Sequence, residues 1–93
     1  MSAPPNWNEL LGQEVVLDLA SQFVCLGRLV QQQGDYLLLA EADVHDLRDT
    51  PTTSREQYVV AARLHGINAT RRYVWVALRE VVAISRLADV MAE

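Results

Sequence analysis

The fold class is decided by residues 14–41, which read EVVLDLASQFVCLGRLVQQQGDYLLLAE. A period of two begins at Glu14, where Val15, Leu17 and Leu19 share one face of a strand over 14–20. Two further strand runs follow over 23–32 and 36–41, joined by Ser21-Gln22 and by the turn Gln33-Gly34-Asp35. A period of two is typical of a strand with one buried face, and short connections join antiparallel neighbours. We therefore predict a three-stranded antiparallel meander. Gly27, inside the second run, predicts a sharp bend or a close backbone approach.

A short helix is predicted immediately before the meander. Asn6 is a favourable N-cap, Glu9 stands at the capping-box position, and Gly12 provides a C-terminal stop. Residues 1–5 contain two consecutive prolines, so this segment is predicted to be a flexible tail. A helix this short is not stable by itself, so we expect it to pack against another part of the molecule.

Residues 43–72 are predicted to be a variable insertion. Its first part, residues 43–53, is polar and rich in turn-forming residues, which predicts a loop. Ser54 and Gln57 form a capping box and Gly66 closes the segment, which favours a helix over residues 54–65. The apolar residues between them fit a strand about as well, so a strand that extends the sheet stays an alternative.

Two final strands are predicted over residues 73–78 and 81–85, separated by Arg79-Glu80. Both runs are apolar on both faces, and such strands are normally buried on both faces. Unpaired strand edges of this kind promote association. We therefore expect a second copy of the chain to cover them, edge to edge, in a closed homo-oligomeric ring. The predicted interface residues are Val74, Val76, Val81, Val82 and Ile84.

Length and composition predict a single cytoplasmic domain spanning residues 1–93. The hydrophobic fraction is 51%, which is too high for a disordered chain. The apolar runs are far shorter than the roughly 20 residues that cross a bilayer, so no membrane partner is expected, and no signal peptide is visible. Cys25 is the single cysteine and is expected to be an inert core thiol.

Charge is distributed unevenly along the chain. The net charge of -4 argues against indiscriminate binding of polyanions. Residues 1–59 carry three arginines against nine acids, whereas residues 60–88 carry five arginines against one acid. Arg71 and Arg72 beside Tyr73 form the strongest arginine-plus-aromatic cluster, which suits phosphate and base contacts. A solvated loop or a subunit contact is the alternative for this cluster.

Two segments of the chain carry a family pattern. The first contains Leu11–Leu19 and then Gly27-Arg28-Leu29, and the second is Val74–Ser85. Over residues 6–42 and 73–86 the chain resembles the Sm/LSm family of Sm-like, Hfq-related domains. The resemblance implies a mainly β fold, in which a short N-terminal helix precedes a strongly bent, five-stranded antiparallel barrel of SH3-like type. Residues 43–72 fall in the loop that varies between family members, so the helix predicted for residues 54–65 would be an insertion between strands three and four. The resemblance also implies a hexameric or heptameric ring, in which strand four pairs with strand five of the next copy, and single-stranded RNA binding around a central pore.

The family's RNA-contact residues are only partly present. The family's first RNA loop has an aspartate, two residues, a bulky apolar residue and an asparagine; here residues 35–39 place Leu39, or Leu37 in a shifted register, at the asparagine position. The family's Arg-Gly pair is matched by Ala77-Leu78, with Arg79 one position later. Packing of Tyr36 and an ion pair of Arg79 are the alternatives to RNA contact. The predicted RNA-binding residues are Asp35, Tyr36 and Arg79 from the resemblance, together with Arg71 and Arg72.

Catalytic and metal chemistry is not expected from this sequence. Asp43, His45, Asp46 and Asp49 are close together, but they lack the glycine-marked pattern of a calcium loop and are expected to form an acidic loop. No nucleophile, base and acid set stands out, so we expect no enzyme activity, no cofactor and no metal. Two functions remain: a ring that binds single-stranded RNA, or an oligomeric scaffold that binds a protein partner through residues 43–66.

Overall fold

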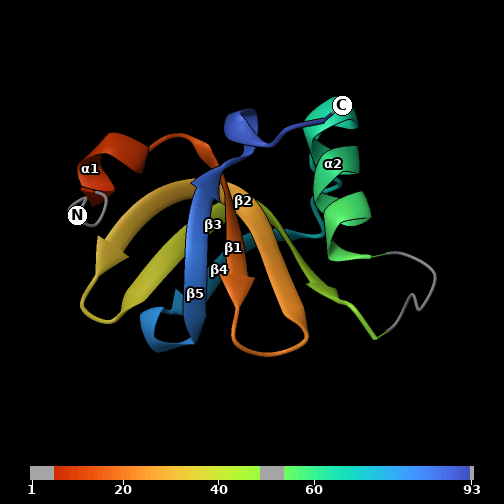
Figure 1. Ribbon diagram of the computed structural model, residues 1–93. Helices are drawn as coiled ribbons and strands as arrows, with labels where there is room; N and C mark the ends of the chain where they lie inside the picture. The colour runs from red at the N-terminus through yellow and green to blue at the C-terminus, as the bar shows by residue number, and fades with distance from the viewer. Residues whose placement is uncertain (1–5, 49–53, 93) are drawn as a thin grey trace, which may run out of the picture.

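The structure is a computed structural model that describes residues 6–48 and 54–92 (Figure 1). Its elements are α1 (Trp7–Leu10), β1 (Glu14–Leu19), β2 (Phe23–Gln33), β3 (Tyr36–Asp46), α2 (Arg55–His65), β4 (Arg71–Ala77), the 3₁₀ turn η1 (Leu78–Glu80), β5 (Val81–Arg86) and the 3₁₀ turn η2 (Leu87–Asp89). The five strands form one antiparallel sheet in the order β4-β3-β2-β1-β5. The predicted mainly β fold, with a short first helix and a second helix between strands three and four, is confirmed.

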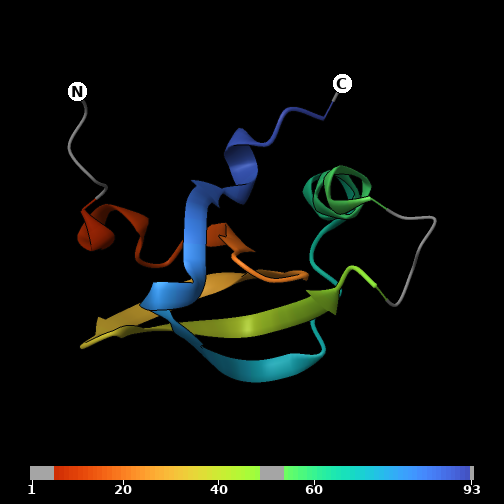
Figure 2. The ribbon, with the colours of Figure 1, turned by 60° about the horizontal axis from the view of Figure 1, so that its bottom comes forward.

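The sheet is strongly curved: β5 passes in front of β3 and β4 in the view of Figure 1, and its ribbon stands steeply to both in Figure 2. The inner, concave side contains a core of nine buried residues: Leu10, Val15, Leu17, Cys25, Leu29, Leu37, Leu39, Ala42 and Val76. The outer side has a second core under α2 and η2, formed by Val16, Val24, Leu26, Val59, Ala62 and Leu87. Successive strand residues such as Val15 and Val16 therefore enter different cores, as alternation requires. Both faces are therefore buried in the middle of β1 and in the first half of β2.

The helix α1 lies against one end of the sheet, as predicted. The Asn6 side chain caps it by accepting a hydrogen bond from the backbone N–H of Asn8 at 3.0 Å. Leu10 is buried in the inner core. Gly12 follows with a positive φ of 82° and donates its N–H to the carbonyl oxygen of Leu29 at 2.7 Å. The helix is thus fixed to β2 by a backbone bond as well as by its apolar side.

Gly27 marks the place where the sheet bends. A Cβ atom at this position would lie 3.0 Å from the Cβ atoms of both Ala42 and Leu39. The pairing register between β2 and β3 shifts between Leu26 and Arg28, and Glu41 on the opposite strand has a φ of +46°. A bulge of this kind inserts an extra residue and increases the local twist. The predicted close backbone approach at Gly27 is confirmed.

The predicted loop over residues 43–53 was wrong in its first part. β3 continues to Asp46, and residues 43–46 pair with Phe23–Leu26 of β2. The predicted insertion was likewise too long at its far end, since β4 begins at Arg71. Asp43 and His45 remain in the strand because their side chains contact Tyr58 of α2 and, for Asp43, also Thr70 in the segment that follows it. Residues 49–53, including Asp49, lie outside the described residues, as does the predicted tail over residues 1–5.

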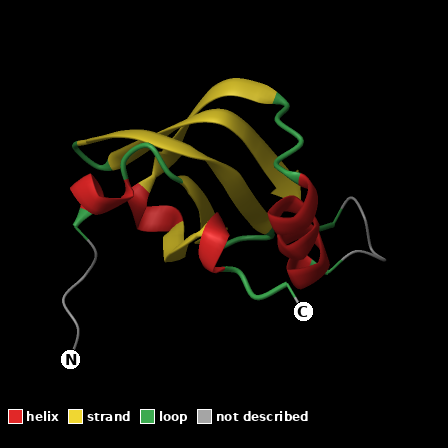
Figure 3. Cartoon of the chain, turned by 90° about the horizontal axis from the view of Figure 1, so that it is seen from above, coloured by secondary structure: helices red, strands yellow, loops and turns green. Residues whose placement is uncertain are grey.

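The helix α2 confirms the helical interpretation of residues 54–65. Both capping-box bonds are present: the Ser54 hydroxyl accepts from the Gln57 N–H at 3.1 Å, and the Gln57 side chain accepts from the Ser54 N–H at 2.8 Å. Val59 and Ala62 are buried against the outer face of the sheet, and the C-terminal segment ends beside this helix (Figures 1 and 3). Among the described residues, no helix has the length and hydropathy needed to cross a membrane.

Candidate assembly edges and nucleic-acid interface

The sheet has two open edges, β4 and β5. Among the described strands, β4 pairs with β3 alone and β5 pairs with β1 alone. The inner face of each edge strand is covered by the chain itself: Val76 is buried, and Val74, Val81 and Ile84 pack against the inner core. Val82 is 71% exposed. Of the five predicted interface residues, only Val82 therefore presents its side chain fully to the outside.

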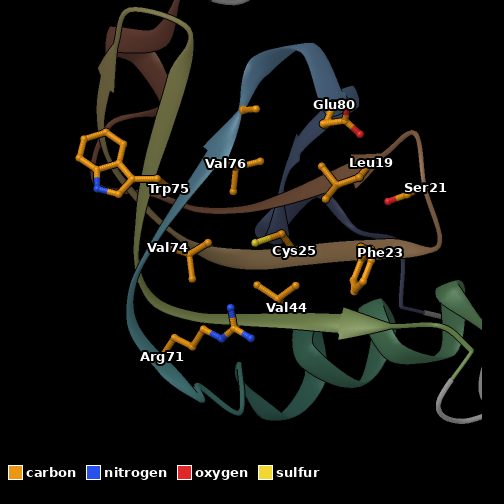
Figure 4. A pocket seen from close by; sticks show the side chains of 11 residues that line it. Leu19, Ser21, Phe23, Cys25, Val44, Arg71, Val74, Trp75, Val76 and Glu80 are labelled. Atoms are coloured by element: carbon orange, nitrogen blue, oxygen red, sulfur yellow. The ribbon is translucent and has the colours of Figure 1, made fainter.

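A cavity of about 630 Å³ lies at the open side of the barrel, between β4 and the neighbouring ends of β1 and β2, with Glu80 of η1 also in its lining. Figure 4 shows Val74 and Val76 directed into it, toward Cys25 and Leu19, while Trp75 points to the opposite side of β4. The Arg71 side chain also points into this cavity, toward Val44. A second strand laid along β4 would cover its opening.

Cys25 lies at the floor of this cavity, on β2. Burial raises the pKa of its thiol to about 12; the negative charge of Asp43 raises it further, and the positive charge of Arg71 opposes the rise. A thiol of this kind stays protonated near neutral pH and is a poor nucleophile. Cys25 therefore acts as an apolar core residue.

The β2–β3 turn and η1 lie side by side at one end of the barrel. Leu78 donates its backbone N–H to the carbonyl oxygen of Asp35 at 2.8 Å, and Tyr36 pairs with Ala77. Arg79 follows directly and is exposed. The structure therefore brings together three of the five predicted RNA-binding residues, Asp35, Tyr36 and Arg79.

The other two predicted residues, Arg71 and Arg72, lie at the opposite end of β4. Arg71 pairs with Ala42, whereas Ala77 pairs with Tyr36. Arg71 and Ala77 are six positions apart along the strand, which is about 20 Å at about 3.3 Å per residue. The single basic patch predicted from the sequence is thus divided between two ends of the molecule.

Trp75 is a candidate contact residue that the sequence analysis did not identify. Its side chain is 51% exposed, and that of Tyr36 is 42% exposed. Together with Gln33, Gly34 and Asp35 they line an open pocket of about 520 Å³. The alternation of Val74 and Val76 with Trp75 was the available signal, because it places the indole ring on the face opposite the core.

Ion pairs distinguish two groups of arginines. Four arginines form ion pairs within the chain: Arg28 with Glu41, Arg48 with Asp46, Arg55 with Asp18 and Arg86 with Asp89. The remaining four have no carboxylate within 4.0 Å among residues 6–48 and 54–92, namely Arg63, Arg71, Arg72 and Arg79. Arg71 and Arg72 begin β4 and Arg79 follows it in η1, so arginines without an ion pair to a described residue are concentrated along this edge strand.

The acidic segment before α2 serves to attach that helix. The carboxylate of Asp43 accepts hydrogen bonds from the hydroxyls of Tyr58 and, at 2.7 Å, Thr70. The His45 ring stacks on Tyr58 with centroids 4.1 Å apart. Burial, and then the bond to Asp43, raises the pKa of the Tyr58 hydroxyl above its ordinary value. In the part of the chain that is described, no three His, Cys, Asp or Glu side chains converge as metal ligands would.

Asp46, the next acid of this segment, pairs with Arg48 instead of with α2. Hydrogen bonds from the Arg48 side chain and backbone lower the pKa of this carboxyl to about 2. The carboxyl is therefore ionised throughout the neutral range.

Solved structures of similar fold support the architecture. A chain of the Pyrococcus abyssii Sm protein in complex with a uridine heptamer superposes with a TM-score of 0.54 at 20% identity, covering 85% of this chain and 89% of that chain. A chain of the NatC complex bound to Gag peptide and CoA gives 0.55 at 19% identity, covering 85% and 87%, and a chain of the NatC complex bound to CoA gives 0.55 at 18%, covering 89% and 86%. No protein-family model matches the sequence, and no curated protein matches it significantly. The strand order, the bent meander and these superpositions together show that the chain has the Sm-like fold.

Proposed function

We propose that the chain has a binding rather than a catalytic role, in which copies assemble into a ring through β4 and β5 and the ring binds single-stranded RNA. The observation that carries this proposal is the pair of open edges at the two ends of one sheet. Pairing of one copy's β4 with the next copy's β5 uses both edges in a heterologous contact, and such contacts generate rings when the rotation closes. An RNA-bound Sm protein of the same fold supports the proposal.

The cavity at the open side supports the assembly step. It is lined by Val74 and Val76 of β4, and none of the described strands pairs with the outer edge of β4. An incoming β5 would pair with the free N–H and C=O groups of β4 and remove the partly exposed Val74 from water. Arg71 points into the same cavity, which favours a subunit contact over an RNA contact for this residue.

The opposite end of β4 supports the RNA step. Tyr36 and Trp75 are exposed aromatic rings, and base stacking on such a ring contributes about 1–3 kcal/mol. Arg79, beside them on η1, has no carboxylate partner among the described residues and can bind a phosphate. A ring would repeat this group of residues once in every copy, which suits a linear polymer.

Native mass spectrometry tests the assembly. The parent chain should be an oligomer, and Val82→Asp should dissociate it, because the aspartate would place a charge on the β5 edge. Leu64→Asp is the matched control, since Leu64 is 57% exposed on α2 and lies away from both edges. A monomeric parent chain at micromolar concentration, or a Val82→Asp variant that keeps the parent mass, would contradict the proposed ring.

Titration of labelled oligo-U and oligo-A strands at two salt concentrations tests RNA binding. Affinity should fall steeply as salt rises, and Arg79→Ala should flatten that dependence by removing phosphate contacts. Trp75→Ala should weaken binding about 5- to 150-fold at each salt concentration, the equivalent of one stacked base. Arg63→Ala is the control, because Arg63 is an unpaired arginine on α2. Absence of binding at low salt would refute the RNA function.

A scaffold function is the second candidate. Chains of this fold occur in the NatC complex, in which a peptide and CoA are bound. In this chain the 43–66 segment carries α2, whose outward side exposes Leu64. An oligomer that binds no RNA at low salt would favour this function, with a protein partner on α2.

A further inference from the structure

The pocket beside Trp75 has walls that fit one planar group. Tyr36 lies directly opposite Ala77, and Trp75 is two residues before Ala77 on the same face of β4. Diagonal neighbours of this kind lie about 7–8 Å apart, within reach of aromatic side chains. Ala77 has only a methyl group, so it leaves the space between the two rings open, in agreement with the pocket of about 520 Å³. A nucleobase can therefore stack between Tyr36 and Trp75.

The polar lining of the pocket has a defined hydrogen-bonding pattern. The side-chain oxygen of Gln33 already accepts a bond from the Gln31 amide at 2.7 Å, so Gln33 presents its NH₂ group as a donor. The Asp35 carboxylate forms no side-chain bond within the described residues, although its backbone carbonyl accepts from Leu78. A carboxylate is an acceptor at both oxygens. Gln33 and Asp35 both line the pocket, so one amide donor and one carboxylate with two acceptor oxygens are available at its wall.

We infer that this pocket selects guanine in single-stranded RNA, an inference that rests on the RNA function proposed above. The Watson–Crick edge of guanine carries a carbonyl acceptor followed by two adjacent N–H donors, which complements the Gln33 amide and both oxygens of Asp35. Adenine and cytosine each offer one amino donor next to a ring-nitrogen acceptor. Uracil offers a single N–H between two carbonyls, and one of these carbonyls would face the carboxylate.

The absence of an asparagine at residues 37 and 39 agrees with this assignment. Leu37 and Leu39 are fully buried in the inner core and cannot contact a base. The polar groups that can reach a stacked base between Tyr36 and Trp75 are then those of the β2–β3 turn. Base selection therefore depends on Gln33 and Asp35.

Fluorescence anisotropy with labelled heptamers tests the inference. The strands are seven uridines and the same strand with guanosine, adenosine, cytidine or inosine at the central position, at one fixed low salt concentration. We expect the guanosine strand to bind about tenfold more tightly than the uridine strand, equivalent to about 1.4 kcal/mol. The inosine strand should lose most of this gain, because inosine lacks the 2-amino donor that pairs with the second oxygen of Asp35.

The base preference is examined with one test variant, one matched control and a third variant as an independent check. Asp35→Asn should abolish the guanosine preference, because it replaces one acceptor by a donor and leaves the backbone contact to Leu78 intact. Glu56→Gln removes the same charge from the exposed side of α2 and should keep the preference. Circular dichroism checks that the Asp35→Asn and Glu56→Gln variants are folded. Gln33→Leu removes the amide donor of the pocket and so tests the second polar contact independently.

The outcomes separate this inference from the proposed function. Equal binding of all strands, a preference for another base, or a guanosine preference that survives Asp35→Asn would overturn guanine selection while leaving RNA binding established. Failure of every strand to bind would instead refute the RNA function itself.

Discussion

Replacing Gly27 with alanine tests how the sheet is bent. The new methyl carbon would lie 3.0 Å from the Cβ atoms of Ala42 and Leu39, whereas carbon atoms in favourable contact are about 3.5–4.0 Å apart. Both neighbours are Cβ atoms, so no rotation of a side chain can move them away. The strands β2 and β3 must separate by about 0.5–1 Å at this point.

The expected loss of stability follows from two opposing effects. Overpacking of a closely packed core destabilises a protein by about 1–3 kcal/mol. Alanine also restricts the unfolded chain, which returns about 0.4–1 kcal/mol. We therefore expect Gly27→Ala to lower the free energy of unfolding by about 1–2 kcal/mol, which corresponds to about 4–8 °C in Tm for each kcal/mol in a domain of this size.

Urea denaturation followed by circular dichroism at one protein concentration measures this effect. The second substitution Ala42→Gly removes one of the two short contacts, so it should recover part of the loss, with a coupling energy of at least about 0.5 kcal/mol. Gly12→Ala is the control: a methyl group at Gly12 would meet no described atom within 4 Å, and the φ of this residue is +82°. Its loss of stability therefore arises from backbone conformation and should not respond to Ala42→Gly. A Gly27→Ala variant as stable as the parent, or no coupling to Ala42→Gly, would refute the close-approach explanation of the bend.

Three further predictions concern single side chains. Iodoacetamide at pH 8 should alkylate Cys25 about a thousand times more slowly in the folded than in the urea-unfolded protein, because its pKa is raised from 9.0 to about 12; equal rates would contradict its burial. Because the pKa of the Cys25 thiol is raised, the folded state holds the thiol proton more tightly than the unfolded state does. The free energy of unfolding should therefore fall as pH rises above 9. A free energy of unfolding that stays constant across an alkaline pH series would contradict this. Tyr58→Phe removes the hydroxyl that donates to Asp43, and the loss of about 1.5–3 kcal/mol should accelerate amide exchange in α2 at least tenfold; unchanged exchange would show that this bond does not hold the helix. Arg48→Ala should return the pKa of Asp46 from about 2 toward its ordinary value of 3.8, which carboxyl NMR titration can detect, and a titration still centred near 2 would assign the lowered pKa to another cause.

The local elements of this chain could be predicted because short-range patterns specify them. The period of two that begins at Glu14, together with the turns at Ser21-Gln22 and residues 33–35, identified β1, β2 and the first half of β3. The Ser54–Gln57 capping box identified α2. Each of these signals acts between residues that are two to four positions apart. Gly27 also indicated the bend, since a glycine inside a strand removes the atom that would prevent close approach.

The end of β3 could not be predicted, because its stability depends on a distant helix. Residues 43–46 are polar and acidic, which by itself favours a loop. In the folded chain Asp43 accepts bonds from Tyr58 and Thr70, fifteen and twenty-seven residues away. No local pattern contains those partners.

The candidate site, too, depends partly on local sequence and partly on contacts between distant residues. The sequence by itself determined which residues have the chemistry to contact RNA, namely the exposed arginines, Asp35 and Tyr36, and it determined that the final strands are apolar. Only the tertiary structure shows that Trp75 lies beside Tyr36 and that Arg71 and Arg72 lie at the other end of β4. Side-chain chemistry and alternation are properties of neighbouring residues, whereas the distance between two side chains on different strands is set by pairing register and by the curvature of the whole sheet.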